Sequence, residues 1–322
     1  MLINNFLFHA FDMIKSLLTL EDLSKKELTE IIDRSVEIFK SIKNQSSRTN
    51  KRTKKTWKRE NELNIYSEEL KNKVGLIYFE KPSTRTRISF ETAIYKLGGK
   101  VIYSSPQDTQ ISRGEDLRDF IKVVEGYVDF AICRVNSHKT LEVFAENSQI
   151  PIINALSDLS HPTQIISDLA TIKLLLGTYE GRKIVFLGDA KNNVARSWIE
   201  ALLVLGNFQL VFSCPPGYEP DFGSGYSVEH DPQKAVQKAD VIYTDVWFSM
   251  GQEYSEEKEK KMEVYRVDKS KISDAKLVMH CLPAKKGKEI SEDVFSMYED
   301  VIFTQSHMKL ATAISILENL DV

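Results

Sequence analysis

The chain has 322 residues, of which 42% are hydrophobic and 28% are charged, and its formal net charge is −3. That length favours two domains, and that composition is typical of a folded globular protein rather than a disordered one. The small negative charge predicts no general attraction to nucleic acid, and no apolar run reaches the roughly 18 residues that span a membrane. The three cysteines (Cys133, Cys214 and Cys281) form no CxxC pair, so we expect a reducing, cytoplasmic location with neither a disulfide framework nor a zinc site.

An amphipathic helix and a basic stretch come before the first predicted strand. Residues 21–41 alternate Leu, Ile and Val with charged residues at helical spacing, which predicts a helix. Residues 48–59 then carry seven Lys or Arg and no acid. We interpret this basic stretch as a solvated surface loop, because it offers only Trp57 for stacking on a base. A phosphate-rich partner is the alternative interpretation.

Strand and helix patterns alternate along the rest of the chain. The predicted strands cover residues 74–79, 100–106, 129–135, 150–156, 183–189, 208–215, 239–247 and 276–283. Helices are predicted after residue 83, ending at Gly98-Gly99, and over residues 115–127, 161–177, 194–207 and 231–239. The alternation predicts an α/β fold with two similar-sized, doubly wound parallel-sheet domains. We expect the helix that begins at His161-Pro162 to link them, with the active site in the cleft between them.

The stretch FEKPSTRTRISFE, residues 79–91, lies where the first predicted strand ends and a helix begins. A helix N-terminus offers free N–H groups and partial positive charge, so it attracts anions. Ser83, Thr84 and Thr86 add hydroxyl donors, and Arg85 adds a planar fork that suits phosphate oxygens. The alternative is that the two arginines only pair with the flanking glutamates. We favour an anion site because five consecutive donors stand together.

Other polar residues share this placement at strand ends and helix starts. They are Arg134, His161, Asn192, Asn193, Asp245, His280 and Cys281. Ligands of open α/β sheets bind outside the carboxyl ends of the strands, so the shared placement predicts one site. A lone histidine is more often structural, but His161 opens a helix one turn before Gln164. Asp245 ends an apolar strand, where a carboxylate without a partner is costly.

Residues 79–91 resemble the carbamoyl-phosphate signature of the aspartate and ornithine carbamoyltransferase family. HPTQIISDLAT, LGDAKNNVARS, TDVWFSMGQE and HCLPA follow in the family's order, so the resemblance covers nearly the whole chain from about residue 13. DVWFSMG and HCLP resemble the ornithine-using members rather than the aspartate-using ones. The resemblance implies transfer of the carbamoyl group of carbamoyl phosphate to the δ-amine of L-ornithine, with no metal or organic cofactor.

The resemblance also implies a role for each matching residue. The carbamoyl-phosphate positions are Ser83, Thr84, Arg85, Thr86, Gln110, Arg134, His161, Gln164 and Lys309, with Arg85, Arg134 and His161 catalytic. The ornithine positions are Asn193, Asp245, Ser249, Met250, Cys281 and Leu282. No acyl-enzyme step is required, so we do not predict covalent catalysis at Cys281.

Assembly and domain limits follow from the same resemblance. Gln110 and Arg113 lie in a loop that resembles the segment reaching a neighbouring subunit in family trimers, and a polar surface loop is the alternative. A homotrimer or a multiple of trimers is therefore expected. Residues 13–160 match the carbamoyl-phosphate domain, completed by a C-terminal helix at 305–320, and residues 178–304 match the ornithine domain.

The main departure from the family is Lys309, which stands where an arginine is usual and lacks its bidentate fork. Lys309 leaves open a regulatory pseudoenzyme. A carbamoyltransferase for aspartate, putrescine or an acylated ornithine also stays open, although the Ser249-Met250-Gly251 turn and Cys281 argue against it. A nucleic-acid-binding protein that uses residues 48–59 is the third alternative, and the acidic overall charge argues against it.

Overall fold

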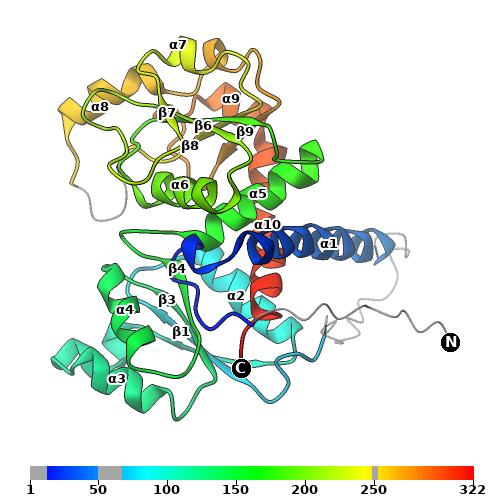
Figure 1. Ribbon diagram of the computed structural model, residues 1–322, viewed down its shortest axis with the longest axis vertical. Helices are drawn as coiled ribbons and strands as arrows, with labels where there is room; N and C mark the ends of the chain where they lie inside the picture. The colour runs from blue at the N-terminus through cyan, green and yellow to red at the C-terminus, as the bar shows by residue number, and fades with distance from the viewer. Residues whose placement is uncertain (1–12, 50–66, 249–252) are drawn as a thin grey trace.

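Within residues 13–49, 67–248 and 253–322, which the computed structural model describes, four parallel strands form the first sheet (Figure 1, lower half). They are β1 (Val74–Phe79), β2 (Lys100–Ser104), β3 (Phe130–Arg134) and β4 (Ile152–Leu156), in the order β2-β1-β3-β4. The helices of this half are α2 (Thr84–Lys96), α3 (Leu117–Val124) and α4 (His138–Glu146). Two short 3₁₀ turns, η2 (Pro106–Asp108) and η3 (Gln110–Arg113), follow β2.

The second sheet has five parallel strands in the same described ranges and lies in the upper half of Figure 1. Its members are β5 (Lys183–Leu187), β6 (Gln209–Ser213), β7 (Ser227–Val228), β8 (Val241–Thr244) and β9 (Leu277–His280), in the order β7-β6-β5-β8-β9. The helices of this half are α6 (Asn193–Leu205), α7 (Pro232–Ala235), α8 (Glu256–Met262) and α9 (Glu292–Met297). The 3₁₀ turns η4 (Glu263–Tyr265) and η5 (Lys269–Lys271) follow α8.

The central strands of both sheets are buried on both faces, as their sequences require. In β1, Leu76 and Tyr78 belong to one apolar cluster, whereas Ile77 and Phe79 belong to another. Successive side chains of a strand point to opposite faces, so each face of the first sheet packs against its own layer. Residues 184–187 of β5 divide between two clusters in the same alternating way. This confirms the predicted α/β fold of two doubly wound parallel sheets.

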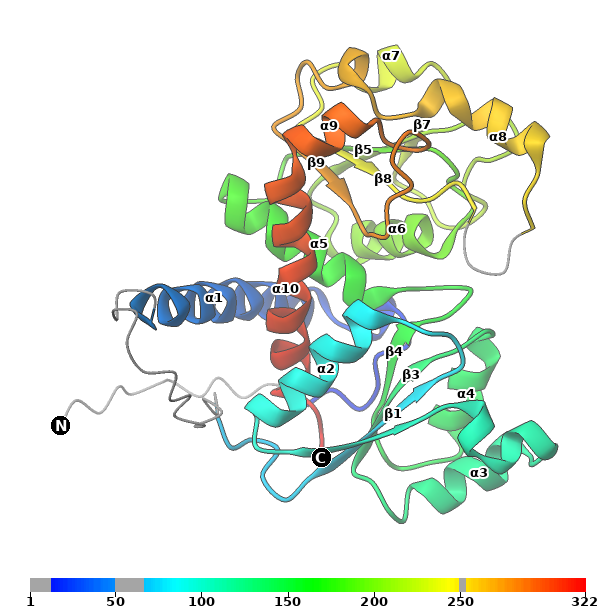
Figure 2. The same cartoon turned by 180° about the vertical axis from the view of Figure 1, so that it is seen from behind.

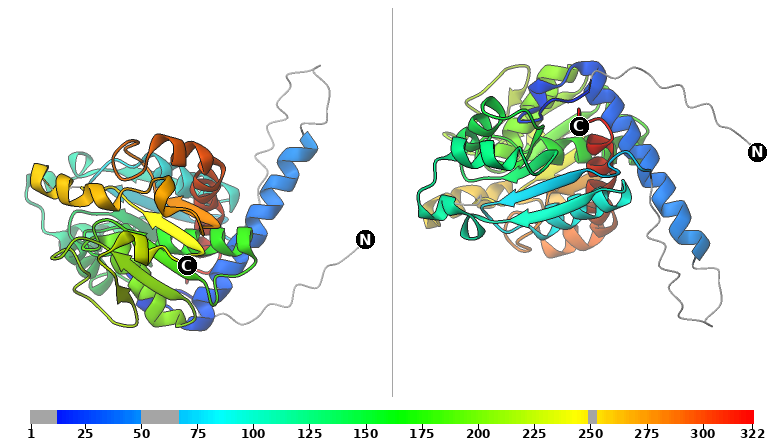
Figure 3. Two further views of the ribbon diagram at one scale, coloured as in Figure 1. Left: turned by 90° about the horizontal axis from the view of Figure 1, so that it is seen from above. Right: turned by 90° about the horizontal axis from the view of Figure 1, so that it is seen from below.

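Three long helices join the halves. Helix α5 (Pro162–Leu176) follows β4 and leads into β5, and α10 (Glu299–Leu317) packs against α1 (Lys25–Thr49), α2, α5 and β9. Figure 2 shows α10 running from the second sheet down beside α2, and Figure 3 shows one end of α1 extending beyond both sheets. One apolar cluster includes residues of both sheets and of α5 and α10, which ties the two halves together. The domain limits at 13–160 with 305–320, and at 178–304, stay predictions.

Several elements differ from their predicted extent. The first helix begins at Lys25 rather than residue 21, after the 3₁₀ turn η1 (Leu20–Asp22), because Ser24 and Glu27 exchange capping hydrogen bonds of 3.2 and 2.7 Å. The helix expected at 231–239 stops at Ala235, and Lys238 adopts a left-handed φ of 57°. The C-terminal helix begins at Glu299 rather than residue 305 and ends at Leu317.

Elements without a clear pattern were not predicted: α4, α8, α9 and the two-residue strand β7. Most of the basic stretch at 48–59 lies outside the described residues. No helix in the described part of the chain is both long and apolar enough to cross a bilayer.

Candidate active site

The first turn of α2 presents backbone N–H groups at the carboxyl end of β1. Ser83 precedes this turn in an extended conformation, and its side chain makes no capping hydrogen bond. The preceding loop is held in place because the Glu80 carboxylate accepts from Asn136 N–H at 2.6 Å, and Glu80 N–H donates to the Arg134 carbonyl at 2.8 Å. Thr86 is buried on the inner side of the turn. The N–H groups that a helix leaves unpaired at its start thus lie beside the end of β3.

The two arginines of this turn have different surroundings. Arg87 donates to Glu91 at 2.8 Å, and its guanidinium lies 3.5 Å from the centre of the Tyr103 ring. The alternative interpretation, a structural ion pair, is therefore correct for Arg87. Arg85 is half-buried, burial lowers its pKa, and it forms no ion pair within the described ranges. Arg85 is thus the arginine available to an anion.

Three cations converge beside this turn. Arg134, at the end of β3, is 6% exposed and Lys309, on α10, is 8% exposed. Burial lowers the pKa of Arg134 to about 10 and the pKa of Lys309 to about 8. Repulsion from Arg85 contributes to both shifts, and repulsion from Arg134 contributes to that of Lys309. Buried like charges destabilise one another, so the site favours a bound anion that neutralises them.

His161 lies at the N-cap of α5 and faces the same cations. Its backbone N–H donates to Ser197 Oγ on α6 at 2.8 Å, which fixes the start of α5 against the second half of the molecule. Burial, followed by repulsion from Lys309 and Arg134, lowers the His161 pKa well below its ordinary value. The imidazole is therefore neutral at pH 7. Its buried Nδ1 has no hydrogen-bond partner among the described residues, so this nitrogen is available to a ligand.

Gln164, one turn into α5, connects Lys309 to a buried carboxylate. Its Oε1 accepts from Lys309 Nζ, and its Nε2 donates to Asp168 at 2.8 Å. Asp168 also accepts from Tyr243 at 2.7 Å and from Gln305 at 2.7 Å. Asp168, Tyr243 and Gln305 were not predicted as site residues. The available signals were Asp168 as the one acidic residue of α5, and Gln305 one turn before Lys309.

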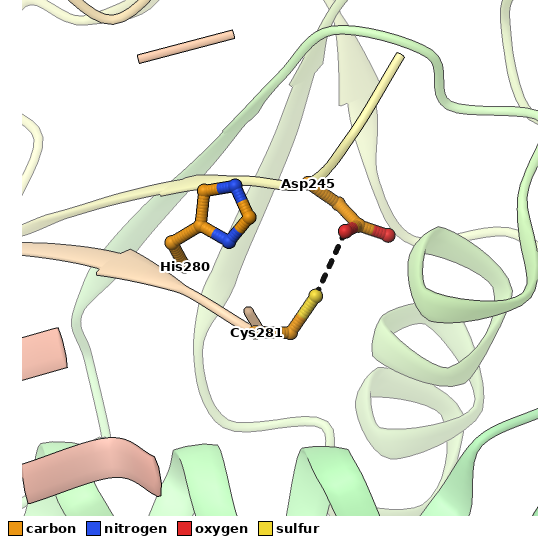
Figure 4. A group of neighbouring side chains, drawn as sticks. All are labelled: Asp245, His280 and Cys281. Atoms are coloured by element: carbon orange, nitrogen blue, oxygen red, sulfur yellow. Dashed lines mark hydrogen bonds between the residues drawn. The ribbon is translucent and has the colours of Figure 1, made fainter. Parts of the chain in front are cut away.

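The ends of β8 and β9 bring Asp245 and Cys281 together. Thr244 and His280 are paired in the sheet register, so the next residue of each strand lies side by side. The Cys281 thiol points at the Asp245 carboxylate and donates to it at 2.8 Å (Figure 4). Burial raises the pKa of both groups, and Asp245 raises that of Cys281 further. Cys281 is thus a protonated thiol and a poor nucleophile.

A metal ion is poorly suited to this pair, although potential ligand atoms of Asp245, His280 and Cys281 lie within 4.8 Å of one another. His280 Nδ1 accepts from Leu282 N–H at 2.9 Å, and His280 Nε2 lies 3.0 Å from Glu289 Oε1. Both imidazole nitrogens therefore already have partners, and Figure 4 shows the ring beside the Asp245–Cys281 bond. A metal ion would have to break these hydrogen bonds to reach His280, whereas an ammonium group could approach the Asp245 carboxylate directly.

The anion end and the Asp245 end belong to one site. Burial lowers the pKa values of Arg85, Arg134 and Lys309, and Cys281 opposes the shift in all three. A group has this effect only when it is close, so Cys281 lies beside the cation cluster. The structure therefore brings Arg85, Arg134, Lys309 and Cys281 together.

The remaining predicted residues are placed as follows. Asn193 begins α6 and its amide donates to the Ser157 carbonyl at 2.6 Å. Leu282 adopts a left-handed φ of 55°, an uncommon conformation that is enriched at functional sites. Gln110 and Arg113 are exposed in η3. Ser249 and Met250 lie outside the described residues.

Comparisons with known proteins identify the family. The family model described as aspartate/ornithine carbamoyltransferase, carbamoyl-P binding domain, matches residues 15–174, and the Asp/Orn binding domain of the same family matches residues 180–320. The chain belongs to the aspartate/ornithine carbamoyltransferase family. It is accordingly a carbamoyltransferase, and the family resemblance inferred from the five motifs is confirmed.

Individual carbamoyltransferases match almost the whole chain. The "Ornithine carbamoyltransferase" of Syntrophus aciditrophicus (strain SB) is 41% identical over 310 residues, which are 92% of this chain and 99% of the relative. The solved ornithine carbamoyltransferase of Pyrococcus furiosus has a TM-score of 0.82 and 36% identity, and the match covers 96% of this chain and 97% of that one. The anabolic ornithine carbamoyltransferase of Campylobacter jejuni has a TM-score of 0.80 and 35% identity, covering 94% and 98%. Both sequence and architecture therefore correspond over both domains.

Proposed function

We propose that this carbamoyltransferase converts carbamoyl phosphate and L-ornithine to L-citrulline and phosphate. The observation that carries the proposal is the closeness of Cys281 to Arg85, Arg134 and Lys309, because it puts an acidic, ammonium-binding end beside an anion-binding end. The names of the similar proteins support ornithine as the acceptor. In the reaction a C–N bond forms, the C–O bond to phosphate breaks, and the proton lost by the amine leaves with phosphate.

The first requirement of this reaction is to hold the leaving phosphate. The proposed phosphate contacts are the α2 N–H groups and the side chains of Ser83, Thr84, Arg85 and Thr86, with Arg134 shared with the carbonyl. Lys309 and Gln110 complete the set. Repulsion among the buried cations, which lowers their pKa values, is relieved when a phosphate dianion binds. Binding thus uses electrostatic energy already present in the free protein.

The second requirement is to stabilise the carbonyl oxygen as it becomes negative in the tetrahedral transition state. Thr86, Arg134 and His161 are the proposed donors, and the neutral imidazole of His161, whose backbone N–H is bonded to Ser197 on α6, can donate without changing charge. Gln164 is proposed to accept from the carbamoyl NH₂ group through Oε1. The catalytic residues of the proposal are Arg85, Arg134 and His161.

The third requirement is to orient ornithine with its δ-amine neutral. Asp245 is the proposed partner of the α-ammonium group, and Cys281 and the Leu282 carbonyl lie along the side chain. Asn193, Ser249 and Met250 complete the proposed acceptor site. The attack is direct, because a thiol whose pKa is raised by burial gives Cys281 little thiolate for a covalent step.

We also propose the assembly and setting of the enzyme. A homotrimer or a multiple of trimers would let the exposed residues Gln110 and Arg113 reach a neighbouring subunit's site. A cytoplasmic location and a role in arginine biosynthesis fit this reaction, and two of the similar proteins are named anabolic.

Arginine substitutions at the α2 turn test the proposal. We expect Arg85→Ala to lower kcat/KM for carbamoyl phosphate by at least about 100-fold, the usual loss of one transition-state donor. Arg87→Ala is the matched control, because Arg87 is paired with Glu91, and its loss should be below about tenfold. Citrulline formation by purified protein is the readout. Equal losses for the two variants would contradict the assigned anion site.

A further inference from the structure

Asp168 is a fully buried carboxylate in the part of α5, residues 162–172, in which every residue is buried. It is 0% exposed, and Ile165, Leu169 and Ile172 around it on α5 are also buried. A buried carboxylate is costly unless hydrogen bonds satisfy its oxygens. Asp168 Oδ1 accepts from Gln164 Nε2 and Gln305 Nε2, and Oδ2 accepts from the Tyr243 hydroxyl. Three donors at 2.7–2.8 Å therefore satisfy this carboxylate in its ionised form.

These hydrogen bonds set the orientation of two amides. An ionised carboxylate only accepts, so both glutamines must turn Nε2 toward Asp168 and Oε1 away from it. The freed Oε1 of Gln164 accepts from Lys309, at the edge of the anion site. The freed Oε1 of Gln305 accepts from His280 N–H at 3.0 Å, one residue before Cys281. One carboxylate therefore connects the anion-binding end to the strand that carries the acceptor end.

Asp168 is also the acid that balances Lys309. Burial lowers the Lys309 pKa to about 8, and Asp168 is the largest influence that opposes the shift. Around Lys309, Arg85 from α2 and Arg134 from β3 lower its pKa, and Cys281 after β9 raises it. The groups that act on Asp168 are Tyr243, Lys309 and the two glutamine amides, and burial raises its pKa to about 6. Asp168 and Lys309 are thus both charged between about pH 6 and pH 8.

We propose that Asp168 is a positioning residue for carbamoyl transfer: it turns Gln164 Oε1 toward the carbamoyl NH₂ group and keeps Lys309 protonated for the bound anion. The inference rests on the proposed carbamoyl transfer from carbamoyl phosphate. Asp168 touches neither substrate, so its effect passes through Gln164 and Lys309. The hydrogen bond from His280 N–H to Gln305 Oε1 also holds this network against β9, the strand that leads to the acceptor end.

The pH profile of kcat/KM for carbamoyl phosphate, at saturating ornithine, separates positioning from simple stabilisation. Asp168→Asn keeps the shape of the side chain and removes the charge that raises the Lys309 pKa. We therefore expect the alkaline limb of the pH profile to move about one pH unit below its wild-type position near 8. KM for carbamoyl phosphate should rise about tenfold or more. Adding Lys309→Arg should remove that limb, because arginine stays protonated. Tyr243→Phe is the matched control: it keeps the carboxylate and removes one donor, so the acid limb near 6 should rise while the alkaline limb stays.

Each outcome decides the inference. An Asp168→Asn variant that only loses thermal stability, with an unmoved alkaline limb, overturns it. If Asp168→Asn does not fold, Tyr243→Phe decides alone: a raised acid limb supports positioning and an unmoved one refutes it. If the wild-type protein forms citrulline but the variants do not move the limbs of the pH profile, the role of Asp168 is refuted and the proposed function stands. Wild-type protein that forms no citrulline would refute the proposed function instead.

Discussion

The proposed role of Lys309 predicts that carbamoyl-phosphate binding depends on pH in a way that an arginine at this position would not give. Burial lowers the Lys309 pKa from 10.5 to about 8. The protonated form carries the charge that binds the anion, so this contribution is present below pH 8 and is lost as pH rises through 8. One pH unit on each side of the pKa changes the protonated fraction from roughly 90% to roughly 10%. From pH 7 to pH 9 we therefore expect about a tenfold fall in kcat/KM for carbamoyl phosphate, or about 1.4 kcal/mol.

The assay is citrulline formation at saturating ornithine from pH 6.5 to pH 9.5, for wild type, Lys309→Arg and Lys309→Met. Titration of carbamoyl phosphate is common to all three and cancels in the ratios. Lys309→Arg should stay level through pH 9, because a guanidinium keeps its proton. Lys309→Met should be low at every pH, because it never carries the charge. Parallel profiles for wild type and Lys309→Arg would show that titration of Lys309 does not control carbamoyl-phosphate binding.

Three further predictions concern the acceptor end and the core. Cys281→Ala should keep turnover and raise KM for ornithine by at most about tenfold. In the wild-type protein the Cys281 thiol should resist alkylation by iodoacetamide at pH 8, because its raised pKa keeps it protonated. Rapid alkylation, or loss of all turnover in the variant, would contradict a protonated, non-nucleophilic thiol. Asp245→Asn should raise KM for ornithine about 30-fold or more, because the variant loses a charge-assisted hydrogen bond worth ~2 kcal/mol. Steady-state kinetics that show an equal rise in KM for carbamoyl phosphate would oppose the assigned role. Trp198→Ala should lower the free energy of unfolding by about 3–5 kcal/mol, because Trp198 is fully buried and packs edge-on against Phe208 and Tyr243. Urea unfolding is the measurement, and a shift in its midpoint equivalent to less than about 1 kcal/mol would contradict this prediction.

The sequence predicted the elements whose burial imposes a regular pattern. Strand β1 matches its predicted range because VGLIYF is apolar on both faces, and α5 matches because Pro162 fixes its start and Gly177 follows its end. Strand β7 has only two residues, both exposed, so its sequence has no alternation of apolar and polar residues from which a strand could be predicted. Helix α8 is almost entirely charged, and only Glu259 and Met262 in it are buried, so its apolar pattern is too weak to detect.

The residues of the candidate site that sequence could suggest are polar residues at a strand end or a helix start, such as Arg134, His161 and Asp245. The Asp168 network was not predictable in the same way. Its members come from α5, β8 and α10, and only the folded arrangement puts Tyr243 and Gln305 within 2.7 Å of one carboxylate. A single acidic residue inside an apolar helix indicates a buried charge, but it does not indicate its partners.

One site is proposed to join the anion-binding turn of α2 to an ornithine-binding pair of strand ends. The most direct measurement is kcat/KM for the acceptor with purified protein and saturating carbamoyl phosphate, comparing ornithine with aspartate and putrescine. We expect citrulline formation with a preference for ornithine of at least about 100-fold, because only ornithine offers both an α-ammonium group for Asp245 and a δ-amine for the carbamoyl carbon. Equal or faster carbamoylation of aspartate or putrescine would contradict the assignment of Asp245 and Cys281 to the acceptor.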